Sequence, residues 1–480
     1  MALGTKQSKN ETLQKKKIIY IGGDSGGNEL MFRISQEVEQ RHNTTSFYIS
    51  TSKIGSANFK ELGVKKEQLY EIDHLNFKLT KNPDKNYLHH AEVKYDFRIW
   101  DIWQVAAKRK KSRLKLSEDS ILSLMESICK KAEWIAQHVK PDYAILCCVA
   151  GFHLVMMIRI FEKYGIEVLD FSNPRLPERF CFANELASNF PLLNRIYSER
   201  KQKGLTPSEI KESKEIIQRF KEEHFKPSDS TRVKESWPQV VRKYQRYLKI
   251  IYQRKKIPNF VNNLYYPIKE KVMRRFMSRF EKPVTGEKYV LFFLHVQPEA
   301  STSIMGKWYE NQLNLIENIV RSLPCDYKLY VKEHVWNFST RPRDYHHEIK
   351  KFPSVRLITP FSSSYDLIAN SSAIVTITGT VGWEGILLQK PVITFGNVFY
   401  NVFDQVQKVE KIEELPAIIK RRIDTVVDLD QTLTFVSSVL ASSFPGLGMI
   451  PADCQNRSLE PKNIKLLVDG LEKHVAYLRL

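Results

Sequence analysis

The segment at residues 373–396, AIVTITGTVGWEGILLQKPVITFG, constrains the fold more than any other part of the chain. An apolar run of strand length leads into a threonine-glycine turn, a short helical stretch and a second apolar run. Two buried strands joined in this way form a β-α-β unit, which is typical of sheets that helices cover on both faces. The segment therefore predicts an α/β protein with a doubly wound parallel sheet.

The same alternation of strands and helices occurs in two separate stretches of the chain. In the first, the apolar runs KIIYI, TSFYIS, YAILCC and IEVLDF alternate with helical spacings. In the second, the alternation begins at KYVLFFLHV and continues through YKLYVKEH to PVITFG. Each stretch has the pattern of a Rossmann-like unit. Residues 50–116 are polar and poorly periodic, and no element is assigned to them.

These patterns divide the 480 residues into five expected segments. They are a disordered leader at 1–16, a first Rossmann-like domain at 17–197, a helical basic connector at 198–285, a second Rossmann-like domain at 286–455 and a C-terminal helix at 456–480. The last helix has the length and spacing needed to return to the first domain.

The net charge of +20 at pH 7 indicates an acidic partner. Residues 242–282 hold thirteen basic and two acidic residues, interleaved with tyrosine and phenylalanine. This combination suits an anionic membrane surface, while nucleic acid binding and a solvated basic helix are the alternatives. The basic residues expected to form the membrane patch are Arg254, Lys255, Lys256, Arg274 and Arg275.

The N-terminal sequence MALGTKQSKNETLQKKK is polar and lacks the apolar core of a signal peptide. The six cysteines show no metal-binding spacing, and we interpret them as reduced core thiols. We therefore expect a cytoplasmic protein that the basic connector holds peripherally on the inner face of the cell membrane.

The turn at Thr378, Gly379 and Thr380 lies between a buried strand and the start of a helix. Main-chain N–H groups and hydroxyls at a helix N-terminus attract an anion, so the turn resembles a phosphate cradle. Glu384 lies on the first turn of the helix and is placed to accept hydrogen bonds from sugar hydroxyls. The alternative interpretation is an ordinary helix cap with a glutamate that complements the helix dipole.

Two further strand ends of the same unit carry polar residues. Lys332 and His334 end the strand YKLYVKEH, where a cation would neutralise the phosphates of a leaving group. Gln297 and Glu299 follow the first strand of the unit, in the motif HVQPEAS with His295. Because open α/β sheets bind ligands at the carboxyl ends of their strands, these residues should converge on one crevice. The alternative is that they are solvated strand ends.

The order KEH, RDYHHEI and VRLITPFSSSYDLIANSSAIVTITGTVGWEGILLQKPVITFG, preceded by QPEAS, resembles the capsule polysaccharide biosynthesis family. That family includes the Kdo transferases of bacterial capsule assembly. The resemblance covers about residues 290–400, with a weaker similarity in GIEVLDFSNPRLPERF. Two departures are Val335, where the family's His-Pro motif has proline, and Gly385, where alanine is more usual.

The resemblance implies a GT-B fold, in which two Rossmann-like domains face a cleft, and a glycosyltransferase that uses a nucleotide-sugar as donor. His334 matches the histidine that contacts the nucleotide phosphate, Thr378 to Thr380 match the phosphate-binding turn, and Glu384 matches the acidic residue after it. The implied acceptor is a polysaccharide or its lipid-linked precursor, with a CMP-, UDP- or GDP-sugar as co-substrate and no cofactor.

Glycosyl transfer also needs a carboxylate or histidine from the first domain, as a base or as a nucleophile. Asp24, in the loop GGDSGGN after the first strand, is the first candidate, and Asp170, near the end of IEVLDF, is the second. An Asx turn or helix cap is the alternative interpretation of Asp24. His334, Lys332 and the main-chain donors near Gly379 can stabilise the leaving nucleotide without a metal ion, so we expect metal-independent catalysis.

Two other functions fit parts of the sequence. A nucleotide-sugar epimerase has the same two-Rossmann architecture and similar phosphate-binding motifs, but it needs no basic aromatic connector. A nonenzymatic basic module would bind nucleic acid or an anionic polymer, but the chain contains no recognised nucleic-acid-binding motif. We therefore expect no nucleic acid partner.

Overall fold

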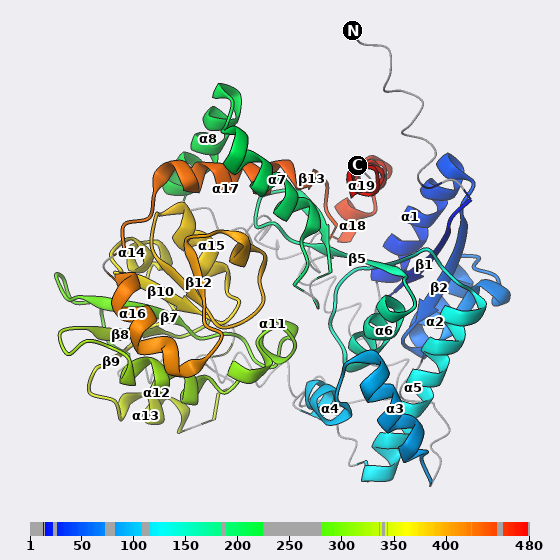
Figure 1. Cartoon of the computed structure of the whole chain (residues 1–480), viewed down its shortest axis with the longest axis horizontal. Helices are drawn as coiled ribbons and strands as arrows, with labels where there is room; N and C mark the ends of the chain where they lie inside the picture. Colours follow the sequence, from blue (N-terminus) through cyan, green and yellow to red (C-terminus); the bar gives the residue numbers. More distant parts are fainter. Residues whose placement is uncertain are drawn as a thin grey trace, which may run out of the picture.

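The computed structural model describes residue 13 and residues 15–22, 26–72, 82–107, 116–184, 186, 188–223, 280–335, 337, 341–342, 344–423, 425–448 and 455–478. Two sheets dominate this part of the chain, and Figure 1 shows the two α/β halves side by side. The expected connector lies mostly, and the expected membrane patch wholly, outside the described residues.

The first sheet has the strand order β13-β6-β5-β4-β1-β2-β3 among the described residues. Its parallel strands run from β3 to β5, and β6 and β13 extend it in antiparallel pairing. The strand bounds are β1 Lys17–Ile21, β2 Thr45–Ser50, β3 Leu69–Glu71, β4 Tyr143–Leu146, β5 Glu167–Ser172, β6 Arg179–Ala183 and β13 Phe444–Pro445.

Both faces of the first sheet are buried because its strands are apolar at consecutive positions. In β1, Ile19 and Ile21 pack on one side with α3 to α6, whereas Ile18 and Tyr20 pack on the other with α1, α2 and α19. The helices of the first half are α1 Gly26–His42, α2 Lys53–Glu61, η1 Lys66–Gln68, α3 Lys85–Tyr95, α4 Ile99–Ala107, α5 Glu118–His138 and α6 Phe152–Lys163.

The second sheet has the order β12-β11-β10-β7-β8-β9, and all its pairs are parallel. Counted along the chain, this is the 3-2-1-4-5-6 order of the Rossmann fold. The strand bounds are β7 Tyr289–Phe293, β8 Lys328–Lys332, β9 Val355–Ile358, β10 Ala373–Thr376, β11 Val392–Thr394 and β12 Val406–Lys408. The predicted fold class, an α/β protein with two Rossmann-like units, is confirmed.

Helices and 3-10 turns cover both faces of the second sheet. Tyr289 and Leu291 of β7 pack on one face, and Val290 and Phe292 on the other. The elements of this half are α11 Ala300–Ser303, η3 Lys307–Tyr309, α12 Gln312–Arg321, α13 Tyr345–Lys350, α14 Ser364–Ala369, α15 Thr380–Leu387, η4 Phe399–Val402, η5 Ile412–Glu414 and α16 Leu415–Ile423.

The chain crosses between the halves more than once. Helices α7 Pro191–Lys203 and α8 Pro207–Glu223 pack against α17 Leu429–Ala441, and the chain then returns to the first sheet at β13. The return therefore occurs before residue 455, where the sequence analysis placed the end of the second domain. After α18 Gln455–Ser458, helix α19 Pro461–Leu478 packs against α1.

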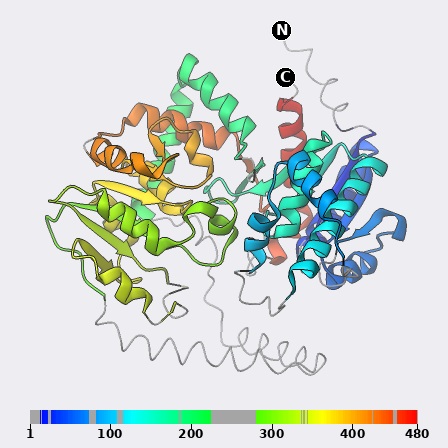
Figure 2. The same cartoon turned by 60° about the horizontal axis from the view of Figure 1, so that its bottom comes forward.

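The two halves also meet where α11 and η3 follow β7. Ile304 joins the apolar core of the first half, and the Lys307 ammonium lies 2.5 Å from the Asp101 carboxylate of α4. Figures 1 and 2 both show α11 on the side of its half that faces the first sheet. The carboxyl end of β7 therefore turns toward the first half.

Two expectations need correction. Residues 50–116 contain α2, β3, α3 and α4. The strand is only three residues long, and α3 buries only Leu88, Ala91 and Tyr95, so the apolar signal of each element is weak. The cysteines are not all core thiols, because Cys148 and Cys325 are exposed. Among the described helices, none combines the length and the apolar composition that a membrane span requires.

Candidate functional site

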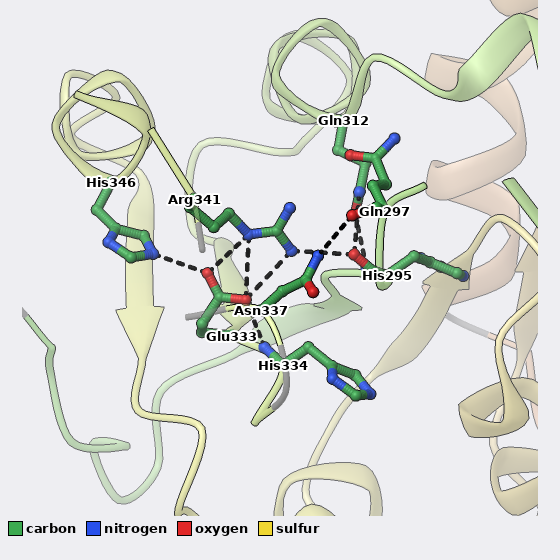
Figure 3. Close-up of polar contacts among 8 residues, drawn as sticks. All are labelled: His295, Gln297, Gln312, Glu333, His334, Asn337, Arg341 and His346. Atoms are coloured by element: carbon green, nitrogen blue, oxygen red, sulfur yellow. Dashed lines mark hydrogen bonds and ion pairs between the residues drawn. The ribbon is translucent and has the colours of Figure 1, made fainter. Parts of the chain in front are cut away.

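Three neighbouring strands of the second sheet end in polar residues at one edge. β7 lies between β8 and β10, so His295 after β7 lies between His334 after β8 and the turn after β10. Arg341 connects the first two, because it donates to the His295 carbonyl at 3.0 Å and pairs with the Glu333 carboxylate that accepts the His334 N–H. The structure therefore places these three strand ends together, and Figure 3 shows the first two.

His295 binds the turn directly. Its ring Nε2 accepts the N–H of Thr378 at 3.3 Å and lies 3.3 Å from the Thr376 hydroxyl oxygen. Burial, with nearby positive charge, lowers the pKa of His295 to about 3. The imidazole is therefore neutral at physiological pH, and its Nε2 is a hydrogen-bond acceptor.

The turn uses several of its donors within the protein. The Gly379 N–H donates to the Thr376 hydroxyl at 2.9 Å, and the Thr378 hydroxyl donates to the Ser301 carbonyl at 3.0 Å. This differs from the expectation that both N–H groups and both hydroxyls face a ligand. Gly379 caps α15 without a side-chain bond, so the first turn of α15, with Thr380, is the part of the turn that keeps donors for an anion.

Tyr400 also binds the main chain of the turn. Its hydroxyl donates to the Gly379 carbonyl at 2.6 Å. Burial raises the pKa of Tyr400; the positive charge of Arg175 opposes this shift and the half-buried Glu384 adds to it. Arg175 lies in the loop after β5, in the first half of the molecule.

Replacing Gly382 with alanine is expected to destabilise the protein by about 1–3 kcal/mol, because the added Cβ overpacks the site. A Cβ at Gly382 would lie 2.5 Å from the Tyr400 hydroxyl oxygen and 2.6 Å from the ring. Urea denaturation measures this loss. Tyr400→Phe is the control, since it removes only the hydrogen bond and should cost about 1 kcal/mol. An unchanged unfolding midpoint in Gly382→Ala would contradict the packing described.

His334 is half-buried at the end of β8. Burial is the main cause that lowers the pKa of His334; Glu333 opposes the shift, whereas Lys332 and Arg341 add to it. The imidazole of the free protein is therefore neutral at pH 7, whereas the sequence analysis expected a positive charge here. A bound phosphate would raise this pKa and draw a proton onto the ring.

Lys332 and Gln297 are engaged within the protein. The Lys332 ammonium is buried, donates to the Pro360 carbonyl at 3.1 Å and lies 5.1 Å from the centre of the Phe293 ring. The Gln297 amide donates to the Glu310 carbonyl at 2.5 Å. Glu299 is exposed, and its carboxylate accepts the Ser301 hydroxyl at 3.0 Å. Of these three expected donor-binding residues, Glu299 alone is exposed.

The first-half candidates are placed differently. Asp24 lies outside the described residues, as do Arg254, Lys255, Lys256, Arg274 and Arg275. Asp170 is only 1% exposed and lies inside β5, which continues to Ser172. An acceptor hydroxyl does not reach a carboxylate this deeply buried, so in this structure Asp170 is poorly placed as a base.

Sequence reasoning missed two first-half residues. His153 lies on the first turn of α6, which begins after the loop at the carboxyl end of β4, and Arg175 follows the carboxyl end of β5. Both positions are at the sheet edge where α/β proteins bind ligands. Arg175 belongs to the segment NPRLPERF, whose weak similarity to the family was the signal for this position.

Larger cavities lie elsewhere in the described part of the chain. One of 290 Å³ lies beside His474 and Glu162, and one of 520 Å³ lies beside Arg200 and Tyr477. Among the described residues, no three His, Cys, Asp or Glu side chains are grouped as metal ligands. Metal-independent catalysis stays a prediction.

Comparison with known proteins supports the resemblance. The capsule polysaccharide biosynthesis protein family matches residues 204–407, so the resemblance drawn from the motifs is confirmed. This match supports a role in capsule polysaccharide synthesis. No curated protein matches the chain.

Several solved structures are similar to the chain at low identity. KpsC beta Kdo 2,4 transferase of Thermosulfurimonas dismutans is 14% identical, with a TM-score of 0.40, over 67% of this chain and 88% of that one. The beta Kdo 2,7 transferase of the same organism is 14% identical, with a TM-score of 0.36, over 73% and 90%. Anabaena HepE in complex with UDP-glucose is 10% identical, with a TM-score of 0.29, over 97% and 99%. These values support no transfer of activity to this chain.

Proposed function

We propose that this chain, whose residues 204–407 match the capsule polysaccharide biosynthesis family, is a glycosyltransferase that uses a nucleotide-activated sugar. The donor is a CMP-, UDP- or GDP-sugar, and the acceptor is a growing capsular or surface polysaccharide or its lipid-linked precursor. The reaction needs no metal ion and no cofactor.

The observation that carries this proposal is the juxtaposition of His334, His295 and the turn at residues 376–380 on adjacent strand ends. The first turn of α15 offers N–H donors and a helix dipole, and His334 offers an imidazole at the end of β8, with the end of β7 between them. Phosphate oxygens are the ligands that such a set of donors prefers. The family match covers all these residues.

In the reaction, the bond between the anomeric carbon and the phosphate oxygen breaks, and the anomeric carbon bonds to the acceptor oxygen. Negative charge grows on the departing nucleotide, where His334 and the α15 amides stabilise it. The acceptor proton passes to a base of the first half. Asp24 remains the first candidate, and His153, at the carboxyl edge of the first sheet, is the second.

We also propose that the protein works on the inner face of the cell membrane. The support is the charge of the connector and its interleaved aromatic residues. Neutralising Arg254, Lys255, Lys256, Arg274 and Arg275 should reduce cosedimentation with anionic liposomes. An unchanged bound fraction would remove the membrane role without affecting the transferase proposal.

A thermal-shift panel with CMP, UDP, GDP and their sugars tests the nucleotide specificity, because a ligand that binds the folded state raises the melting temperature. Product analysis then separates transfer from epimerisation, since an epimerase changes the sugar without an acceptor. If no nucleotide raises the melting temperature and no sugar nucleotide is consumed, the proposed function is wrong.

A further inference from the structure

The carboxylate of Glu333 is completely buried between two basic side chains. It lies directly after β8, with a side-chain exposure of 0%. The Arg341 Nε is 3.0 Å from its Oε2, and the His346 Nε2 of α13 is 2.7 Å from the same atom. Arg341 and His346 are themselves 4% and 3% exposed, and Figure 3 shows both directed at the carboxylate.

This carboxylate is an acceptor for the neighbouring main chain. Burial alone would raise the pKa of Glu333, but hydrogen bonds from His346, Arg341 and the His334 N–H outweigh it and leave the pKa lowered. The group is therefore ionised at neutral pH. Its Oε1 accepts the N–H of His334 at 2.5 Å, so the carboxylate fixes the backbone that carries the imidazole.

The same network reaches the end of β7. Arg341 donates through Nη2 to the His295 carbonyl at 3.0 Å, and Asn337 donates to the Gln297 carbonyl at 3.3 Å. The Gln312 amide holds the other side of His295, accepting its N–H at 2.7 Å and donating to its carbonyl at 3.2 Å. One guanidinium thus joins the loop of His334 to the loop of His295.

We propose that Glu333 and Arg341 are positioning residues of the donor site, which hold His334 and His295 in register with the turn at residues 376–380. This inference rests on the proposed function. A 1 Å misplacement of a group that contacts the reacting atoms lowers a rate by about 10²-fold. Loss of the ion pair that fixes both strand ends should therefore have a measurable effect on the function of the site. His346 completes the pairing of the carboxylate.

A purely structural role gives a different expectation. Replacing a whole buried ion cluster with apolar residues of similar volume is often neutral or stabilising, whereas removing one partner strands a buried charge. The variant Glu333→Met, Arg341→Leu, His346→Phe should therefore fold. It lacks the acceptor for the His334 N–H and the donor for the His295 carbonyl, so it separates positioning from stability.

The control is an ion pair of the same sheet that lies toward the amino ends of its strands, whereas the site lies at the carboxyl ends. The Arg356 guanidinium in β9 binds the Glu287 carboxylate just before β7, away from the strand ends that carry the site. The double variant Arg356→Leu, Glu287→Leu should leave nucleotide affinity unchanged. Arg341→Lys is the conservative comparison, because an ammonium lacks the fork that reaches Glu333 and the His295 carbonyl together.

Isothermal titration with the nucleotide preferred by the wild type and NMR of the His334 ring form the test. We expect the triple variant to melt within a few degrees of the wild type, to bind nucleotide on the order of tenfold more weakly or worse, and to show a shifted or broadened His334 ring signal. The nucleotide affinity of Arg341→Lys should lie between those of the wild type and the triple variant. Wild-type affinity together with an unchanged ring signal in the folded triple variant would overturn the proposal.

The ring signal needs no ligand. If the wild type binds no nucleotide, the proposed function fails, and the NMR spectra alone decide whether the network positions His334. If the triple variant does not fold, Arg341→Lys replaces it, and a wild-type affinity and ring signal in that variant count against the proposal.

Discussion

Replacing His334 with alanine is expected to lower the rate of sugar transfer by on the order of 10²–10³-fold, the usual loss when one donor to a developing oxyanion is removed. His334 is half-buried, so its removal should leave stability nearly unchanged. Steady-state kinetics with saturating acceptor measures the effect. His334→Gln is the matched control, because its side-chain amide keeps a donor and should retain part of the rate.

The same residue predicts a pH dependence. Burial lowers the pKa of His334 in the free protein, and a bound phosphate raises it again. A group whose pKa is raised in the complex adds affinity that is fully present below the free pKa and is lost as the pH rises through the bound pKa. Affinity for the donor nucleotide should therefore increase as the pH falls from about 8 to 6. His334→Gln should flatten this profile.

Equal pH profiles in the wild type and His334→Gln would show that another group takes up the proton. An unchanged rate in His334→Ala would remove this imidazole from the reaction and leave only the α15 turn as a phosphate site. The two results are independent, because one reports proton uptake on binding and the other reports stabilisation of the transition state.

The sequence predicted the placement of the strand ends because that placement depends only on strand order. Apolar runs identify β7, β8 and β10, and a parallel sheet brings their carboxyl ends to one edge. The Thr-Gly-Thr turn was recognisable for the same reason, since a strand that enters a helix leaves its N–H groups at that edge. Residues 17–50 and 120–171 were assigned from equally strong apolar runs.

The side-chain partners within the site were not predictable in this way. Lys332 looked like a phosphate ligand, but alternation along β8 directs it away from Glu333, and its ammonium binds the Pro360 carbonyl. Thr378 looked like a ligand, but its hydroxyl binds the Ser301 carbonyl. In both cases the partner is a main-chain oxygen from a segment distant in the sequence, which no local pattern predicts.

The network around Glu333 was missed for a related reason. Arg341 and His346 follow Glu333 in a polar stretch with no hydrophobic period, where charged residues normally face solvent. Their burial depends on the chain folding back over the end of β8. The burial of such a carboxylate can be recognised only from the three-dimensional structure.

Breaking that network at one residue is expected to have the largest effect on stability. Glu333→Leu leaves the Arg341 guanidinium, 4% exposed, without its carboxylate, and removing one partner of a buried pair costs about 3–5 kcal/mol. Glu348→Leu on α13 is the control, because its pair with Lys351 is 43% and 55% exposed and should contribute about 0–1 kcal/mol. Urea denaturation of both variants measures the difference.

The stabilisation that Glu333 provides should depend on pH. The pKa of Glu333 is lower in the folded protein than in the unfolded chain, so its stabilisation is present above the unfolded pKa and is lost as the pH falls through the folded pKa. The wild type should therefore lose more stability on acidification than Glu333→Leu does, and the two unfolding free energies should approach each other. Parallel acid profiles would mean that the buried carboxylate does not change its protonation between the folded and unfolded states, and the ion pair with Arg341 would then have no role in stability.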